Sequence, residues 1–431
     1  MAPRPFTLSV PETAITDLKS RLALTRFPDA APGEPWAYGT SVPYAKDLAG
    51  YWQHQFDWRA QEAALNAFPQ FKTALHDIDL HYLHVPGKGP NPYPLLLLHG
   101  WPGSVFEFLD IIPRLTDPAR FGGDAKDAFT VIAPSLPGYG LSFEPGQKRF
   151  SVTDIAACVH DLMTRTLGIP QFAVQGGDWG ASIASCLGYG FPSSVCGIHI
   201  NLLMVPRDRP AGTELSAEQT QYADDLAQWM REETGYQQIQ GTKPQTLAFG
   251  LTDSPAGLAA WIAEKFRSWS DCDGVPENAI SRDRMLGNIA LYWFTGAIGS
   301  SFWPYYGRLH SPWPIPPGET IKVPTGYAAF PKEIVRPPRA IAEKAYANIQ
   351  RWTVMQKGRS LRGHGTACRS RRGDPALFPS PQVIERIHQH GSRRLAFRRL
   401  SRPVPPGRRQ SLPRARSRPG TCPMARPPWL R

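Results

Sequence analysis

The sequence has no apolar run of about 18 residues or more, so it predicts no transmembrane helix and no membrane anchor. The first residues, MAPRPFTLSVPETAITDLKSRL, lack the apolar core of a secretory signal peptide. The six cysteines show neither close pairing nor zinc spacing, which predicts reduced thiols and a cytoplasmic location. Hydrophobic residues make up 42% of the 431 residues, which excludes global disorder and allows a large folded core.

Positive charge is scarce along most of the chain and concentrated at its end. Residues 357–431 hold 19 Lys and Arg residues and two acidic residues, whereas residues 1–356 hold 29 basic and 34 acidic residues. The net charge of +12 therefore belongs to the tail, and the body is mildly acidic. Such a tail fits a nucleic-acid-binding arm or a segment without a role, but it offers few aromatic side chains for base stacking. We expect no nucleic-acid partner.

Short apolar runs alternate with helical spacing from residue 92 onward. Apolar runs at residues 95–98, 129–133 and 172–175 predict buried strands, and residues 151–167 have helical spacing. This alternation predicts an α/β fold, with a mostly parallel sheet covered by helices.

A long helical region interrupts this pattern, with amphipathic stretches at residues 246–270 and 285–298, as an inserted lid would. We expect the following division of the chain: an N-terminal helical extension at 1–90, core at 91–205, a helical lid at 206–315, core again at 316–357, and a basic tail at 358–431.

A glycine-rich turn, GGDWG at residues 176–180, follows the third predicted strand. Its spacing is that of a nucleophile elbow, in which glycines allow a sharp turn from strand to helix and the central side chain enters the site. The central residue is Asp178. A turn in which Asp178 merely caps the next helix fits the same pattern equally well.

An aspartate at the elbow limits the chemistry. A carboxylate displaces a leaving group at saturated carbon and forms an alkyl ester, which water must then hydrolyse with a general base and an oxyanion hole. The backbone N–H groups of Trp101 and Trp179 are expected to supply that hole. We expect His99, in HGWPGS, to bond the loop backbone, and His81 and His84 to be ordinary strand residues.

Segments spread over residues 1 to about 357 resemble epoxide hydrolases of the microsomal and juvenile-hormone type, within the α/β-hydrolase superfamily. They are PWAYG with the segment after it, HGWPGS, PSLPGYGLS, GGDWG, ETGYQQIQGTKPQ, LYWFTGAIGSSFWPYYG and VPTGYAAFPKE. The resemblance implies an α/β-hydrolase fold with an N-terminal extension and a lid. It implies no cofactor, and it implies that a small lipophilic epoxide and water become a vicinal diol through an ester on Asp178.

The resemblance also implies roles for three more residues. Tyr236 and Tyr305 match the two lid tyrosines, with adjacent Tyr306 as the alternative to Tyr305, and Glu333 matches the acid that orients the base. Phenol groups suit this chemistry, because they bind and protonate the departing epoxide oxygen. Without the resemblance, each tyrosine fits a core or lid aromatic and Glu333 fits a surface acid.

The histidine base of the family has no counterpart here. Ser360 stands where the family's GGHFAA-type motif places the histidine, and His364 follows in an unrelated context. The codons allowed from Gly358 onward permit Gly-Gly-His-Phe-Ala in a shifted frame, so one extra base would account for the basic tail. We therefore expect this chain to stop at the ester.

Two rival functions remain open at this stage. A haloalkane dehalogenase shares the aspartate nucleophile, but the lid tyrosines and the N-terminal extension argue against it. A non-catalytic ligand-binding remnant would bind an epoxide or diol without an adduct on Asp178.

Overall fold

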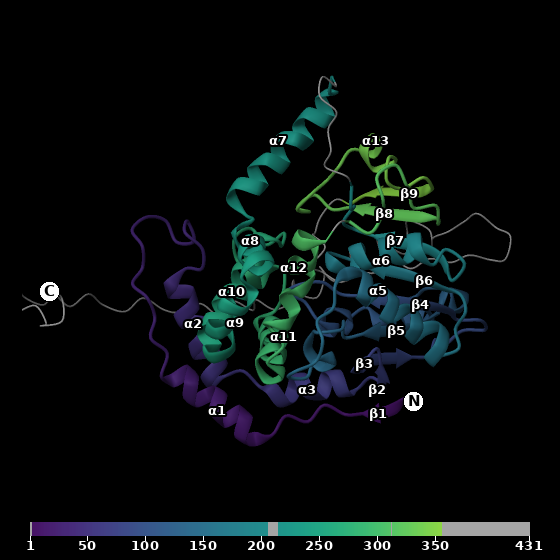
Figure 1. The fold of residues 1–431 in the computed structure, drawn as a ribbon. Coiled ribbons are helices and arrows are strands. Elements are labelled where there is room, and N and C mark those ends of the chain that lie inside the picture. The colour runs from purple at the N-terminus through teal and green to yellow at the C-terminus, as the bar shows by residue number, and fades with distance from the viewer. Residues whose placement is uncertain (1, 206–213, 312, 356–431) are drawn as a thin grey trace, which may run out of the picture. The chain divides into compact units, whose positions relative to one another are not determined.

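The structure is a computed structural model that describes residues 2–205, 214–311 and 313–355, and these residues contain one mixed sheet (Figure 1). The strands are β1 (Arg4–Phe6), β2 (Gln70–Leu75), β3 (Ile78–Val85), β4 (Tyr93–Leu98), β5 (Phe129–Pro134), β6 (Phe172–Gly176), β7 (Val195–Ile200), β8 (Thr325–Ala329) and β9 (Ile349–Val354). Their order across the sheet is β1-β2-β3-β5-β4-β6-β7-β8-β9.

The sheet is parallel from β5 to β9 and antiparallel from β1 to β5. Its central strands are short and almost wholly apolar, as parallel strands covered on both faces must be. The predicted α/β fold with a mostly parallel sheet is confirmed, and the three predicted strands are each part of a slightly longer one.

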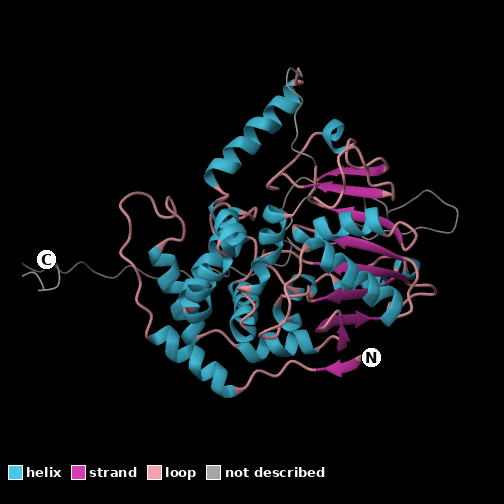
Figure 2. Cartoon of the chain, viewed as in Figure 1, coloured by secondary structure: helices cyan, strands magenta, loops and turns pink. Residues whose placement is uncertain are grey.

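Helices and loops make up the rest of the described chain (Figure 2). They are α1 (Glu12–Ala23), α2 (Val42–His54), α3 (Trp58–Asn66), α4 (Ile112–Thr116), α5 (Val152–Asp161), α6 (Trp179–Gly190), α7 (Ala217–Glu232), α8 (Gly235–Thr242), α9 (Pro244–Asp253), α10 (Pro255–Ser268), α11 (Arg282–Thr295), α12 (Trp303–His310) and α13 (Arg339–Ala342). Within the described ranges, none of them combines the length and the apolar character needed to cross a bilayer.

The first 85 residues contribute strands as well as the predicted helices. Strands β1, β2 and β3 extend the sheet beyond β5, while α2 packs on α10 and α3 packs on α11 (Figure 1). On β3, the buried His81 contacts Ser135 through Nδ1 and Gln70 through Nε2, both at 3.0 Å. His81 is therefore the ordinary strand residue that the sequence predicts.

The helices α7 to α12 are inserted between β7 and β8. The amphipathic stretch predicted at residues 246–270 is two helices, because the chain turns at Ser254. Pro255 has no N–H and holds Ser254 extended (φ −109°, ψ 106°), and the Ser254 hydroxyl then accepts from the Gly257 N–H at 3.0 Å. The stretch at 285–298 stops earlier than predicted, because Gly296 caps α11 with a φ of 66°.

The predictions for Ser360, His364, the frame change and the basic tail fall on residues 356–431, outside the described residues.

Candidate active site

Asp178 occupies the tight turn between β6 and α6, with a φ of 51° and a ψ of −125°. Glycines make the turn possible. A Cβ on Gly176 would lie 2.2 Å from the Gly180 carbonyl oxygen, and a Cβ on Gly180 would lie 2.1 Å from the Leu98 carbonyl oxygen. A strained non-glycine residue held this way is the geometry of a nucleophile elbow. The local structure is therefore the elbow and not a simple helix cap.

The loop after β4 closes over the Asp178 carboxylate. The Trp101 N–H donates to Asp178 Oδ1 at 2.8 Å, and the Trp179 N–H also donates to this carboxylate. A Cβ on Gly100 would lie 2.4 Å from Oδ1, so only glycine lets the loop come this close. We call Gly100, Trp101, Asp178, Trp179 and Gly180 the carboxylate cradle. The two N–H groups that the sequence selected thus lie at the same side chain.

The electrostatics of the cradle set the charge of its carboxyl group. Burial raises the pKa of Asp178 to about 6, the hydrogen bonds from Trp101 and Trp179 oppose the rise, and the charge of Glu333 adds to it. Asp178 is therefore ionised at neutral pH, the state that a nucleophile requires.

His99 holds the loop from within. Its Nδ1–H donates to the Gly100 carbonyl oxygen at 3.0 Å, and its Nε2 accepts from the Leu136 N–H at 3.1 Å. Burial lowers the pKa of His99 to about 4, so the ring stays neutral. The predicted structural role of His99 is confirmed.

Both predicted tyrosines lie above the cradle in a cluster of aromatic rings. The Tyr236 ring stacks on Trp101 with centroids 5.6 Å apart and an interplanar angle of 9°. The Tyr305 ring meets Trp179 edge-on at 4.8 Å and Tyr236 at 5.6 Å. Trp269, at the end of α10, packs against Tyr236 at 4.9 Å. We call Trp101, Trp179, Tyr236, Trp269 and Tyr305 the aromatic cluster.

The structure separates Tyr305 from its neighbour Tyr306. Tyr305 is 5% exposed, and its pKa is raised well above the ordinary value by burial, then by Tyr236 and by the charge of Asp178. Tyr306 instead stacks on Trp303 at 4.8 Å and on His310 at 3.9 Å. Of the two, Tyr305 is the one that belongs to the aromatic cluster.

Glu333 lies in the turn after β8, where its N–H donates to the Phe330 carbonyl oxygen at 3.2 Å. Its side chain is buried, and its Oε1 accepts from the Ile334 N–H at 2.9 Å. The charge of Glu333 acts on both Asp178 and Tyr327. Glu333 is thus a buried acid whose charge reaches Asp178, and it is not a surface acid.

Sequence reasoning missed two residues of α11 that hold the loop after β4 through hydrogen bonds. On α11, the Asn288 amide donates to the Pro102 carbonyl oxygen and the Tyr292 hydroxyl donates to the Gly103 carbonyl oxygen, both at 2.7 Å. A signal was present, because Asn288 interrupts an otherwise apolar helix face.

Sequence reasoning also missed a second carboxyl group beside the cradle. Glu107 Oε1 is buried, and a Cβ added to Gly103 would lie only 1.3 Å from it. Burial and the charge of Asp178 raise the pKa of Glu107 well above the ordinary value. Burial and the charge of Asp178 therefore favour the neutral form of Glu107. The acid in the apolar run VFEFL is the signal that could have found it.

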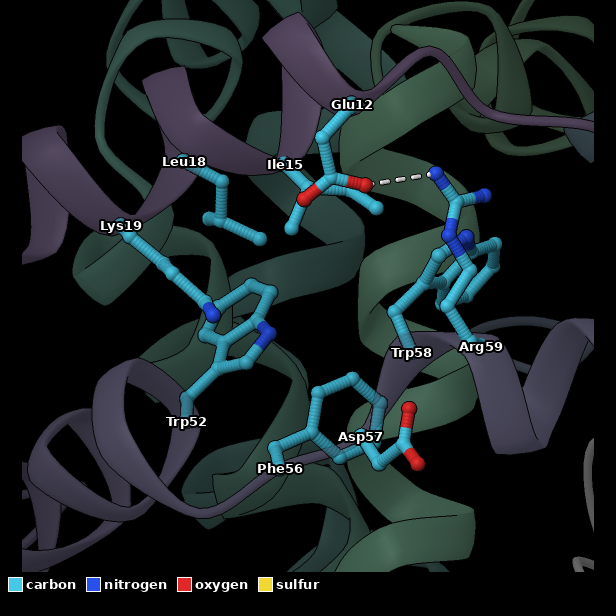
Figure 3. A pocket seen from close by; sticks show the side chains of 9 residues that line it. All are labelled: Glu12, Ile15, Leu18, Lys19, Trp52, Phe56, Asp57, Trp58 and Arg59. Carbon is cyan, nitrogen blue, oxygen red and sulfur yellow. Dashed lines mark hydrogen bonds and ion pairs between the residues drawn. The ribbon is translucent and has the colours of Figure 1, made fainter.

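One cavity in the described part of the chain lies away from these residues. It measures about 100 Å³ and lies between α1, α2 and α3. Trp52 and Trp58 line it, as do Arg59 and Glu12, which form an ion pair at 2.9 Å (Figure 3). None of the candidate site residues lines it.

Comparisons with known proteins agree with this geometry. The family description "Epoxide hydrolase N terminus" matches residues 3–108, and "alpha/beta hydrolase fold" matches residues 93–233. Epoxide hydrolase 1 of Oryctolagus cuniculus is 36% identical over 412 residues, which cover 89% of this chain and 87% of that protein. Juvenile hormone epoxide hydrolase 2 of Ctenocephalides felis is 35% identical, over 82% of this chain and 81% of that protein.

A solved structure is similar over most of its length. The crystal structure of juvenile hormone epoxide hydrolase from the silkworm Bombyx mori has a TM-score of 0.71 and 33% identity, over 84% of this chain and 89% of that one. Fold, elbow and sequence similarity thus point to the same family. The chain belongs to the epoxide hydrolase family, on an α/β-hydrolase fold.

Proposed function

We propose that Asp178 opens a small lipophilic epoxide by attack on a ring carbon, and that Tyr236 and Tyr305 receive the departing oxygen. One observation carries the proposal: the two tryptophans whose N–H groups hold the elbow carboxylate, Trp101 and Trp179, pack against two buried phenols from the inserted helices. The lid that we propose at residues 206–315 supplies both phenols.

In the first step, the Asp178 carboxylate is the nucleophile and a tyrosine phenol is the proton donor. A bond forms between an Asp178 oxygen and the epoxide carbon while that carbon's bond to the ring oxygen breaks. The ring oxygen then takes a phenolic proton, which leaves a phenolate that solvent reprotonates. The product is a hydroxyalkyl ester on Asp178. The apolar rings around the reacting atoms lower the local polarity, which strengthens the hydrogen bonds to the departing oxygen.

The second step is hydrolysis of this ester. Water adds to the ester carbonyl carbon, and the N–H groups of Trp101 and Trp179 stabilise the oxyanion. The intermediate then breaks the bond between the Asp178 carboxyl carbon and the alkyl oxygen. That oxygen takes one proton of the water and leaves as the diol, and the other proton passes to solvent as the carboxylate is restored. The resemblance assigns to Glu333 the role of orienting a base, but this chain has Ser360 where the family has histidine. We therefore propose that the ester accumulates in this chain.

The test is the mass of the intact protein after incubation with styrene oxide. We expect a stoichiometric increase equal to the mass of one epoxide, located on Asp178 by peptide mapping and missing in Asp178→Asn. Diol formation over many turnovers would contradict the proposed arrest. Bound epoxide without an adduct would indicate a binding protein, and halide release from a haloalkane with epoxides untouched would indicate a dehalogenase.

A further inference from the structure

A buried lysine lies against one of the proposed acid groups. Lys265, on α10, is 7% exposed, and its Nζ lies 4.8 Å from the centroid of the Tyr236 ring and 5.4 Å from that of Trp269. Lysine is seldom buried to this extent, because its ammonium group loses water of hydration. Its position inside the aromatic cluster therefore calls for an explanation.

The surroundings of Lys265 provide partners for its ammonium group. Its Nζ forms an ion pair with the neighbouring Glu264, whose other oxygen accepts from the Ser268 hydroxyl at 2.8 Å. The aromatic faces of Tyr236 and Trp269 provide further electrostatic attraction for a cation. The ammonium group thus has partners on both sides, but the packing places it at Tyr236 and not at the solvent.

The Tyr236 phenol is also prepared at its oxygen. The Gln237 side-chain amide donates to the Tyr236 hydroxyl oxygen at 2.9 Å, so that oxygen already accepts one hydrogen bond. Both this hydrogen bond and a cation beside the ring stabilise negative charge on the phenol. A phenol that gives up its proton during ring opening acquires such a charge.

We propose that Lys265 is a positioning residue that makes Tyr236 a stronger proton donor to the departing epoxide oxygen. This inference rests on the proposed function, in which Tyr236 protonates that oxygen. As the proton leaves, the growing charge on the Tyr236 ring is stabilised by the ammonium group, which the folded protein already holds in place. Lys265 itself touches neither the substrate nor Asp178.

The experiment measures the rate constant of ester formation with saturating styrene oxide, by rapid quenching and intact mass. Lys265→Met, which keeps length and removes charge, should slow this step about tenfold, with little change in the epoxide concentration that gives half the maximal rate. Lys265→Arg, which keeps a cation, should restore most of the rate. Thermal unfolding of each variant checks the fold.

A double-mutant cycle separates this role from packing. In a Tyr236→Phe background, where Tyr305 still donates a proton, Lys265→Met should cost nothing more, because the group that it assists is gone. A full tenfold loss in that background would overturn the proposal, as would an unchanged rate in Lys265→Met alone. If Lys265→Met fails to fold, Glu264→Gln is measured in its place. This variant removes the negative charge that pairs with the Lys265 ammonium group. Ester formation slower than in the unaltered chain would then contradict the proposal.

The same measurements distinguish failure of the proposed function from failure of the inference on Lys265. If the unaltered chain forms no ester on Asp178, the proposed function fails, whatever Lys265 does. If it forms the ester and Lys265 variants match it, only the inference on Lys265 fails.

Discussion

The carboxylate cradle and the aromatic cluster share Trp101 and Trp179 but are built in different ways. The cradle consists of backbone groups and glycines from two loops that each follow a parallel strand. The aromatic cluster consists of side chains that come from separate helices and one loop. In the cradle, a single methyl group is decisive, because it would lie 2.4 Å from the Asp178 side chain at Gly100 or 2.1 Å from the Leu98 carbonyl oxygen at Gly180. In the cluster, the loss of one hydroxyl or one charge should have a graded effect.

The largest expected effect lies in the cradle. Gly100→Ala places a methyl group 2.4 Å from Asp178 Oδ1, so either the loop or the carboxylate must shift. We expect ester formation to fall at least about a hundredfold, the usual cost of a displaced reacting group. Rapid-quench mass spectrometry measures it.

The matched control is Gly50→Ala on α2, where an added methyl group meets nothing within 4 Å. This variant should form the ester at the unaltered rate and unfold at the same or a higher temperature, since alanine favours helices. If the rate of ester formation in Gly100→Ala were within threefold of that in Gly50→Ala, the proposed contrast between cradle and cluster would be contradicted.

A smaller effect is expected in the cluster. Tyr305→Phe keeps the ring contacts with Trp179 and Tyr236 but removes one of two proton donors, so ester formation should slow about tenfold. Tyr306→Phe, one residue along and stacked on Trp303, should leave the rate unchanged. If Tyr306→Phe slowed ester formation as much as Tyr305→Phe does, the assignment of the proton donor on α12 to Tyr305 would be contradicted.

The charge of the cradle should appear in the pH dependence. The rate of ester formation should rise about tenfold per unit below pH 6 and level off above it, because Asp178 must ionise and burial raises its pKa to about 6. A rate that is flat between pH 5 and 8 would contradict this assignment.

The same pKa has a consequence for stability. A carboxyl group whose pKa is higher in the folded than in the unfolded state stabilises the fold at low pH, and this contribution is lost as pH rises through about 6. Asp178→Asn should therefore be more stable than the unaltered chain at pH 8, by up to about 3 kcal/mol, with the gap closing near pH 4. Denaturant unfolding at both pH values measures it.

The smallest effect is expected at Glu107, a side chain that borders the cradle. Burial and the charge of Asp178 raise its pKa, so Glu107→Gln copies the neutral acid and should change the free energy of unfolding at pH 7 by less than about 1 kcal/mol. At higher pH the Gln variant should gain on the unaltered chain. A large loss at pH 7 would mean that Glu107 is ionised there.

This contrast also explains what the sequence could predict. The elbow could be found because Gly176, Asp178 and Gly180 act within five residues, where spacing determines geometry. The turn at Ser254 was missed because apolar periodicity continues across it, although Pro255 marked it.

Local sequence patterns could not predict which residues tertiary packing brings to the site. Lys265 and Glu107 are ordinary charges in the sequence, and only the packing of α10 on Tyr236 and of Glu107 on Gly103 gives them a place near the site. Tyr236 and Tyr305 were singled out by resemblance alone, since helical spacing gives no reason to choose them over Tyr306.

The pairing of β3 with β5 bears on how this protein can be shortened. A chain that began at residue 91 would lose β1, β2 and β3 together and leave β5 as an open edge, with its Val131, Ile132 and Ala133 otherwise fully buried. An apolar edge with unpaired N–H and C=O groups recruits strands from other molecules. The N-terminal strands therefore keep the hydrolase core from aggregating.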